Sequence, residues 1–202
     1  MRKDLQIKIE RSITILKKME PIALRYRAQG FIGAFSGGKD SQVIRQLLNM
    51  AEVAHTMKYQ WTTIDPPEVY RFIVEQYPDV VIERPKESFW KLCYRHGILP
   101  TQYKRFCCRE LKESRDFNCV TVTGVRAAES YRRKTRQEVE IQTRRRHPDY
   151  VRGTLDEFNM YKETHVDCIQ GKDKLIVNPI IDWTEEDVWD FLGYMDLPSC
   201  EL

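Results

Sequence analysis

The stretch Phe31–Ser41, FIGAFSGGKDS, decides the fold that this sequence predicts. Its first part, Phe31–Phe35, is a short apolar run typical of a buried strand. Ser36–Ser41 is a turn with two glycines, and apolar residues recur at helical spacing over residues 42–50. A strand, a glycine turn and a helix in this order favour anion binding. Glycines let backbone N–H groups close on an anion, and a helix N-terminus attracts negative charge.

Further short strands alternate with helices along the rest of the chain. We expect strands over 59–64, 80–82, 120–123 and 175–181, and helices over 5–28, 68–76, 87–97 and 188–194. Residues 126–146 read as helix plus loop. This alternation predicts an α/β fold, a three-layer α/β/α arrangement around a mostly parallel sheet. Ligands bind such sheets at the carboxyl ends of strands, where the Ser36 turn, Asp65 and Gly124 are predicted to lie.

The composition limits the classes of protein to consider. A chain of 202 residues, with 33 basic and 30 acidic side chains, is one domain or one domain with a small appendage. We divide it into a helical segment, 1–29, and a nucleotide-binding domain, 30–202. The apolar runs fall far short of the roughly 20 residues of a membrane span. The N-terminus lacks the apolar core of a signal peptide, so we expect a cytoplasmic protein without membrane contact.

The residue types of the Ser36–Ser41 turn predict a phosphate site. Lys39 supplies a full positive charge, and Ser36 and Ser41 supply hydroxyl donors. The turn is not a Walker A loop, which needs four residues between its glycines. The alternative is an ordinary strand-to-helix turn in which Asp40 only caps the helix.

A basic block follows Gly124. Residues 126–146 hold eight Arg or Lys against three acids, which requires an anionic partner or open solvent. Arg126 and Arg133 carry guanidinium forks that suit a sulfate or phosphate, and Glu129 either orients them or binds a metal. The segment 132–146 is otherwise a solvated face, or a surface for a nucleic-acid backbone at 144–146.

The six cysteines have no C-x-x-C spacing and, in the cytosol, are not expected to form disulfides. Cys107 and Cys108 are adjacent and lie between Arg105 and Arg109, whose charges would lower a thiol pKa. Cys93 and Cys119 fall in apolar runs and are predicted to be core.

Four segments together resemble the phosphoadenylyl-sulfate (PAPS) reductase family. The first, residues 35–41, is also similar to the phosphate loop of the N-type ATP pyrophosphatases. The second, 100–112 (PTQYKRFCCRELK), resembles the family's Arg-x-Cys…Lys segment. The third, 123–133 (TGVRAAESYRR), resembles its Gly-x-Arg-x-x-Glu-Ser…Arg segment. The fourth, 178–189 (NPIIDWTEEDVW), resembles its Pro-Ile…Trp segment.

The resemblance implies an adenine nucleotide alpha-hydrolase-like fold and an adenine-nucleotide site. It implies a catalytic role for Lys39, Arg126 and Arg133, and a Mg²⁺ ligand at Asp40 if ATP is the substrate. An iron–sulfur cluster would draw on Cys107 or Cys108 with Cys168 and Cys200, the alternative being free thiols. The nucleotide and its phosphates would contact Ser36, Gly37, Gly38, Lys39, Asp40, Ser41, Asp65, Arg126 and Glu129.

Three functions follow as alternatives. The first is thiol-dependent release of sulfite from a sulfonucleotide, with a thiol reductant or sulfur-carrier protein as partner. The second is cleavage of Mg-ATP between the α and β phosphates, for sulfur transfer or nucleic-acid modification. The third is a nucleotide-binding module without catalysis, with a protein or DNA as its partner. The family's Glu-Cys-Gly-Leu-His tail, which carries the attacking cysteine, has no match in Leu197–Leu202. The identity of the attacking thiol is therefore open. Either the protein is naturally short, or a C-terminal part is missing from this chain.

Overall fold

The computed structural model describes residues 2–113, 116–142, 152–153, 174–198 and 200. The expectations for Arg144–Arg146 and for Cys168 therefore lie outside the described residues. In the described part, no helix combines the length and the apolar character that crossing a membrane requires.

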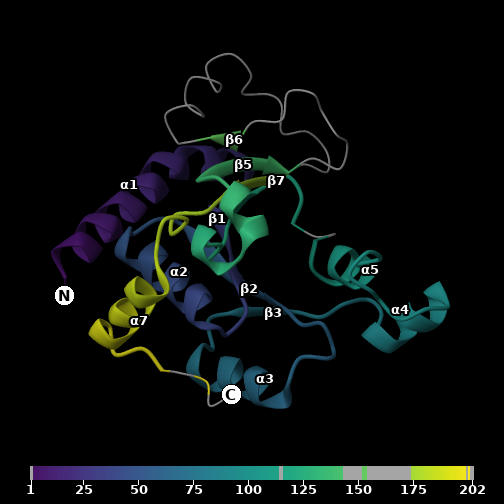
Figure 1. The fold of residues 1–202 in the computed structure, drawn as a ribbon. Coiled ribbons are helices and arrows are strands. Elements are labelled where there is room, and N and C mark those ends of the chain that lie inside the picture. The colour runs from purple at the N-terminus through teal and green to yellow at the C-terminus, as the bar shows by residue number, and fades with distance from the viewer. Residues whose placement is uncertain (1, 114–115, 143–151, 154–173, 199, 201–202) are drawn as a thin grey trace.

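A seven-stranded sheet organises the fold, in the order β3-β2-β1-β4-β7-β5-β6. The first five strands in this order pair in parallel, and β5 and β6 extend one edge antiparallel (Figure 1). This confirms the predicted α/β class with a mostly parallel sheet. The strands are β1 (Phe31–Phe35), β2 (His55–Gln60), β3 (Val81–Glu83), β4 (Val120–Val122), β5 (Val139–Gln142), β6 (Arg152–Gly153) and β7 (Lys174–Val177).

Helices connect the parallel strands. The α-helices are α1 (Lys3–Tyr26), α2 (Lys39–Met50), α3 (Pro67–Gln76), α4 (Phe89–His96), α5 (Phe106–Cys108) and α7 (Glu185–Tyr194). Shorter helical turns are η1 (Arg109–Glu113), η2 (Ala127–Glu129) and η3 (Tyr131–Thr135). A capping box opens α7. Thr184 accepts from the backbone N–H of Asp187, and Asp187 accepts from that of Thr184.

One face of the sheet carries the main hydrophobic core. Phe31 and Phe35 of β1 and Met57 of β2 are buried there with apolar side chains of α1, α2 and α7. In Figure 1, these three helices gather on one side of the sheet. Helix α1 runs through Pro21 without ending, and its apolar stripe belongs to this same core. The division of the chain at residue 29 stays a prediction.

The opposite face of the sheet carries both polar and apolar side chains. Strand pairing aligns Ala34 with Lys58, and Ile32 with Thr121. Paired residues point to the same face, so Lys58 and Thr121 share the face opposite to the core. Polar side chains at alternate positions of neighbouring strands thus leave one side of the sheet suited to a polar ligand rather than to packing.

The prediction of helix and loop over 126–146 is wrong in one part, because residues 139–142 form strand β5. The alternation of buried and exposed residues is hidden in the sequence, because Glu138, just before the strand, and Glu140, within it, are buried acids. Arg11 lies 2.8 Å from the Glu138 carboxylate, and Arg136 lies 2.6 Å from that of Glu140. These ion pairs allow charged residues to occupy buried positions at the strand.

Candidate functional site

The loop 36–41 joins β1 to α2 and has a fixed shape. Gly37 adopts φ +77°, a left-handed conformation, and a Cβ there would meet Ile73 at 3.2 Å. The Ser41 hydroxyl donates to the Gly38 carbonyl (2.7 Å), and the Gln42 amide donates to the Gly37 carbonyl (3.1 Å). Side chains of α2 therefore hold the loop by its carbonyl oxygens at the N-terminus of that helix.

A cavity of about 400 Å³, here called the sheet-face cavity, opens beside this loop. Three segments predicted to converge at strand ends do so here: the Ser36 turn, Asp65 and Gly124 all line it. The predicted site residues that line it are Ser36, Asp40, Ser41, Asp65, Glu129 and Arg133. The sheet face opposite the core forms one wall of the cavity. Its lining residues include Ile32, Ala34, Lys58, Gln60, Thr121, Thr123, Lys174 and Ile176.

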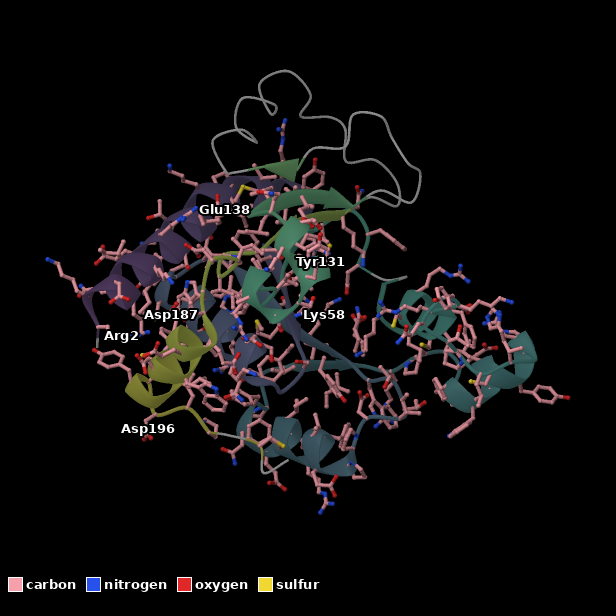
Figure 2. All side chains as sticks on the ribbon, viewed as in Figure 1. Arg2, Lys58, Tyr131, Glu138, Asp187 and Asp196 are labelled. Atoms are coloured by element: carbon pink, nitrogen blue, oxygen red, sulfur yellow. The ribbon has the colours of Figure 1, made fainter. Side chains whose placement is uncertain are left out.

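Lys58 is the centre of a charged cluster in this wall (Figure 2). Its ammonium lies 2.5 Å from a carboxylate oxygen of Glu83 and 2.5 Å from one of Asp116. Gln60 donates to the other oxygen of Asp116 at 3.1 Å. Burial opposes the charged form, but hydrogen bonds to Asp116 and Glu83 outweigh it and raise the pKa of Lys58. The cluster gives the cavity fixed donors and acceptors far from the loop in sequence.

Asp65 is held in a turn at the end of the β2 segment. Its carboxylate accepts hydrogen bonds from the backbone N–H and the hydroxyl of Thr62, both at 2.7 Å. Burial and the adjacent Asp65 carboxylate raise the pKa of Tyr59, which also lines the cavity. The phenol therefore stays protonated at physiological pH, and the role of Asp65 as a nucleotide contact stays a prediction.

Arg126 is 1% exposed, and its guanidinium is occupied by protein carboxylates. Nε donates to Asp40 at 2.6 Å, and Nη2 donates to Glu185 at 2.6 Å. Its backbone N–H donates to Glu129 at 3.2 Å. Burial opposes its charge, but the hydrogen bonds to Glu185 and Asp40 raise the pKa of Arg126. Arg126 is therefore a positioning residue that joins the loop 36–41 to α7. Its contact with a phosphate stays a prediction.

Arg133 faces the sheet-face cavity from η3 and forms an ion pair with Glu129. This pair brings one arginine fork and one carboxylate to the cavity that Asp40 also lines. Lys134 is exposed, as the solvated-face alternative requires.

A second cavity, here called the loop–helix cavity, has a volume of about 560 Å³. It holds Gly37, Gly38 and Lys39 on one side and the α7 side chain Trp189 on the other, with Cys200 also lining it. Lys39 Nζ lies 3.2 Å from Glu185 and 5.8 Å from the centre of the Trp189 ring. Ser36 lines both cavities, so the two cavities adjoin at the loop.

The two tryptophans near the start of α7 differ in burial. Trp183 is fully buried, whereas Trp189 is 52% exposed. The Trp189 indole N–H donates to Glu185 at 3.0 Å, which turns the ring toward the phosphate loop. Sequence reasoning thus missed Trp189 and Glu185, and also Lys58 and Asp116. The polar Lys58 between Met57 and Tyr59, both buried, was a usable signal of a polar sheet face.

The cysteines do not assemble into one group in the part described. The sulfurs of Cys107 and Cys108 are 4.0 Å apart, and the Arg105 guanidinium donates to Cys108 at 3.3 Å. Burial and the neighbouring Cys108 raise the pKa of Cys107. Cys200 lines the loop–helix cavity instead. Cys93 and Cys119 are buried, as predicted.

A metal ion or cluster needs several ligands in one place. Among the residues that the structure describes, no three His, Cys, Asp or Glu side chains gather as a metal site would require. Cys107 and Cys108 supply two thiols where a cluster needs four ligands. Asp40 already accepts from Arg126, which competes with Mg²⁺ for the same carboxylate. The described residues alone therefore do not fit a resident cluster or metal ion.

Comparisons with solved structures show the fold. The PAPS reductase from Candida auris, in a phosphate complex, matches with a TM-score of 0.54 and 16% identity, over 94% of this chain and 88% of that one. The FMN adenylyltransferase of Candida glabrata, with FAD and inorganic pyrophosphate, gives 0.57 and 14%, over 98% of this chain but only 59% of that one. The U34-tRNA thiolase of Methanococcus maripaludis, with its 4Fe-4S cluster, gives 0.51 and 13%, over 97% and 67%.

Sequence comparison shows the family. A search among curated proteins returned no match. The family profile of the phosphoadenosine phosphosulfate reductase domain matches residues 31–202, which include the loop 36–41, Arg126, Arg133 and Cys200. The family and the related adenine nucleotide alpha-hydrolase-like proteins named above are enzymes. The chain therefore belongs to the phosphoadenosine phosphosulfate reductase domain family, an enzyme family with an adenine nucleotide alpha-hydrolase-like fold.

Proposed function

We propose that the protein binds an adenine nucleotide in the sheet-face cavity, with its phosphates on the loop 36–41. The volume of about 400 Å³ accommodates a nucleoside, and the loop offers a helix N-terminus, two hydroxyls and Lys39 to an anion. Family membership supports this proposal, as do two similar structures, one in complex with phosphate and one with FAD and inorganic pyrophosphate.

The reaction that we propose is release of sulfite from a sulfonucleotide by a thiolate. The observation that carries it is the position of Cys200, which lines one cavity with Gly37, Gly38 and Lys39. A nucleotide whose phosphate sits on the loop would direct its terminal sulfonate into that cavity. Lys39 would stabilise the charge on the phosphate oxygen as it leaves.

The bonds in this reaction balance with one external dithiol. The Cys200 thiolate attacks the sulfur, an S–S bond forms, and the S–O bond breaks with its electron pair going to the nucleotide phosphate. One thiolate of the dithiol then attacks Cys200 Sγ, so that sulfite leaves with the S–S electron pair. The second thiol displaces Cys200 from the mixed disulfide, and the dithiol is the species oxidised. A thiol reductant or sulfur-carrier protein is therefore the implied partner.

A second reaction, cleavage of Mg-ATP to AMP and pyrophosphate, is favoured by a separate observation. Asp40 and Glu129 line the sheet-face cavity, and carboxylates near phosphates can bind the Mg²⁺ that ATP carries, once that ion displaces the Arg126 hydrogen bond from Asp40. The related FMN adenylyltransferase with ATP and the related tRNA thiolase support adenylation of an acceptor before sulfur transfer. A cytoplasmic location is proposed for either reaction.

The test is a product assay. The protein is incubated anaerobically with PAPS and a dithiol, and separately with Mg-ATP, and the nucleotide products are separated by ion-pair chromatography. We expect sulfite and adenosine 3′,5′-bisphosphate, both lost in Lys39→Ala and in Cys200→Ser but retained in Cys93→Ala. AMP and pyrophosphate from ATP would replace the first reaction with the second. No turnover of either nucleotide would refute both.

A further inference from the structure

The segment Arg84–Lys112, here called the α4 lobe, carries a surface that the nucleotide site does not use. It contains α4, α5 and the start of η1, and in Figure 1 α4 and α5 stand apart from α1, α2 and α7. The lobe has its own small core, formed by Phe89, Leu92, Cys93, Phe106 and Leu111. Its structure therefore does not depend on burying the outer face of α4.

That outer face is aromatic. Trp90 and Tyr94, four residues apart on α4, point to the same side of the helix and are 65% and 90% exposed. Tyr103, in the loop after the helix, is 96% exposed. Large aromatic side chains left in water on a folded lobe are typical of a binding surface.

The same lobe is strongly basic. Between Arg84 and Lys112 the chain has eight Lys or Arg residues against two acids, in a protein whose net charge is only +3. Lys86, Lys91 and Lys104 are exposed among the aromatic residues. The acids, Glu87 and Glu110, are both paired with Arg95, at 3.1 and 2.5 Å. The surface therefore presents an excess of positive charge together with planar rings.

We propose that the α4 lobe binds RNA through unpaired bases. Exposed rings on which bases stack, interleaved with lysines that contact phosphates, suit a single-stranded polyanion. An apolar protein partner would gain little from the lysines, and a duplex has no unstacked bases to offer the rings. RNA is the nucleic acid whose folds keep loops unpaired, so we assign RNA rather than DNA. This inference does not rest on the proposed reaction.

The lobe is continuous with the nucleotide site. Lys112, at its end, lines the sheet-face cavity together with Asp40 and Arg133. An RNA held on the α4 lobe would therefore reach, at Lys112, the cavity where the nucleotide is proposed to bind. This arrangement suits an RNA that is a substrate or acceptor for the same site.

The test is fluorescence anisotropy with a labelled RNA stem-loop whose loop has about ten unpaired nucleotides, a length typical of such surfaces. We expect binding that Tyr94→Ala and Tyr103→Ala each weaken at least about fivefold, the lower end for loss of one stacked base. Tyr94→Phe, which keeps the ring, should bind as the parent does. Tyr194→Ala removes an exposed tyrosine from α7 and is the matched control, with no change expected.

A charge test accompanies the aromatic test. Lys91→Ala with Lys104→Ala should reduce the slope of log K against log salt by about 1.4, because each phosphate contact to a single strand contributes about 0.7. The control pair, Lys17→Ala with Lys18→Ala on α1, removes the same charge from another surface and should leave the slope unchanged. Circular dichroism checks that every variant is folded.

Four results would overturn the proposal. The first is an RNA affinity of Tyr94→Ala and Tyr103→Ala within twofold of the parent. The second is an equal loss of RNA affinity in the lobe variants and the control variants. A DNA strand of the loop sequence that binds more tightly than the RNA would refute the choice of RNA. Light scattering that shows a dimer abolished by Tyr94→Ala would assign the surface to a second copy of the chain. None of these results depends on nucleotide turnover.

Discussion

Arg126 Nε donates a 2.6 Å hydrogen bond to Asp40, although 86 residues separate the two in the sequence. The bond ties the segment after β4 to the first turn of α2, and the same guanidinium reaches Glu185 on α7. Gly124 makes this approach possible, because a Cβ on it would come within 3.0 Å of the Asp40 backbone. The loop 36–41 is therefore tied directly to the segment after β4 and, through Arg126, to α7.

The first prediction concerns Arg126. Arg126→Ala leaves Asp40 and Glu185 without their shared partner, and we expect the free energy of unfolding to fall by about 2 kcal/mol. The value lies below that of a fully buried pair because Glu185 is half-exposed. Urea denaturation measures the change. Arg71→Ala, which removes a surface pair with Glu68, should cost less than about 1 kcal/mol; equal losses would contradict the positioning role of Arg126.

The second prediction concerns Glu185, which neutralises Lys39 beside the loop. Arg126 and, more weakly, Lys39 hydrogen-bond to it and lower the pKa of Glu185, so it is negatively charged at neutral pH. Glu185→Gln removes a negative charge beside the loop. The repulsion of a phosphate by this exposed charge is worth about 1 kcal/mol at about 4 Å in water, so nucleotide affinity should rise about fivefold. Isothermal titration calorimetry measures the affinity. Glu186→Gln is the neighbouring control, and a rise in both variants would refute the specific effect.

The third prediction concerns the close approach at Gly124. Gly124→Ala places a methyl group within 3.0 Å of Asp40 backbone atoms, so the loop must shift. We expect weaker nucleotide binding and a lower melting temperature. Gly193→Ala is the matched substitution, since its Cβ would meet nothing within 4 Å. Within α7 it should stabilise the protein by about 1 kcal/mol. Unchanged binding in Gly124→Ala would show that the loop does not need this contact.

The fourth prediction concerns pH and Asp187, which binds Arg2 at 2.7 Å and Lys8 at 2.5 Å (Figure 2). Burial raises the pKa of Asp187, but hydrogen bonds from Lys8 and Thr184 outweigh it, so the folded pKa lies below the ordinary value. A lowered folded pKa stabilises the protein above the unfolded pKa of about 3.9, and this stabilisation is lost as pH falls through the folded pKa.

Asp187→Asn should therefore cost about 2 kcal/mol at pH 7, and the cost should shrink below about pH 4. Urea denaturation of both proteins across that range measures it. A cost that stays constant with pH would mean that packing at the α7 cap, rather than the charge of Asp187, stabilises this contact.

The sequence was informative where a structure depends on neighbouring residues. The strand Phe31–Phe35, the glycine loop and the α7 capping box follow from short local patterns, and the structure contains them. Strand β5 was missed because its buried Glu138 and Glu140 look like surface residues until Arg11 and Arg136 are seen beside them. Local spacing does not reveal partners that come from distant elements.

The same limit applies to the site. Six predicted residues line the sheet-face cavity, since strand ends in a parallel sheet meet at one edge. Arg126 was expected to face a ligand, yet two carboxylates 86 and 59 residues away already surround it. The sequence suggests that Trp189, an apolar residue of a helix, is buried like Trp183. In the fold, Trp183 is buried but Trp189 lies at the surface beside Lys39. Only the fold shows which charges and rings meet.

The central claim is that the loop 36–41 binds the phosphates of an adenine nucleotide. Calorimetric titration of the protein with adenosine 3′,5′-bisphosphate and with a non-hydrolysable ATP analogue tests it most directly, beside Lys39→Ala and the surface control Lys17→Ala. The account predicts saturable binding of at least one nucleotide, weakened at least about tenfold in Lys39→Ala, equivalent to 1.4 kcal/mol, and unchanged in Lys17→Ala. Equal affinity in Lys39→Ala and the parent, or binding of neither nucleotide, would contradict it.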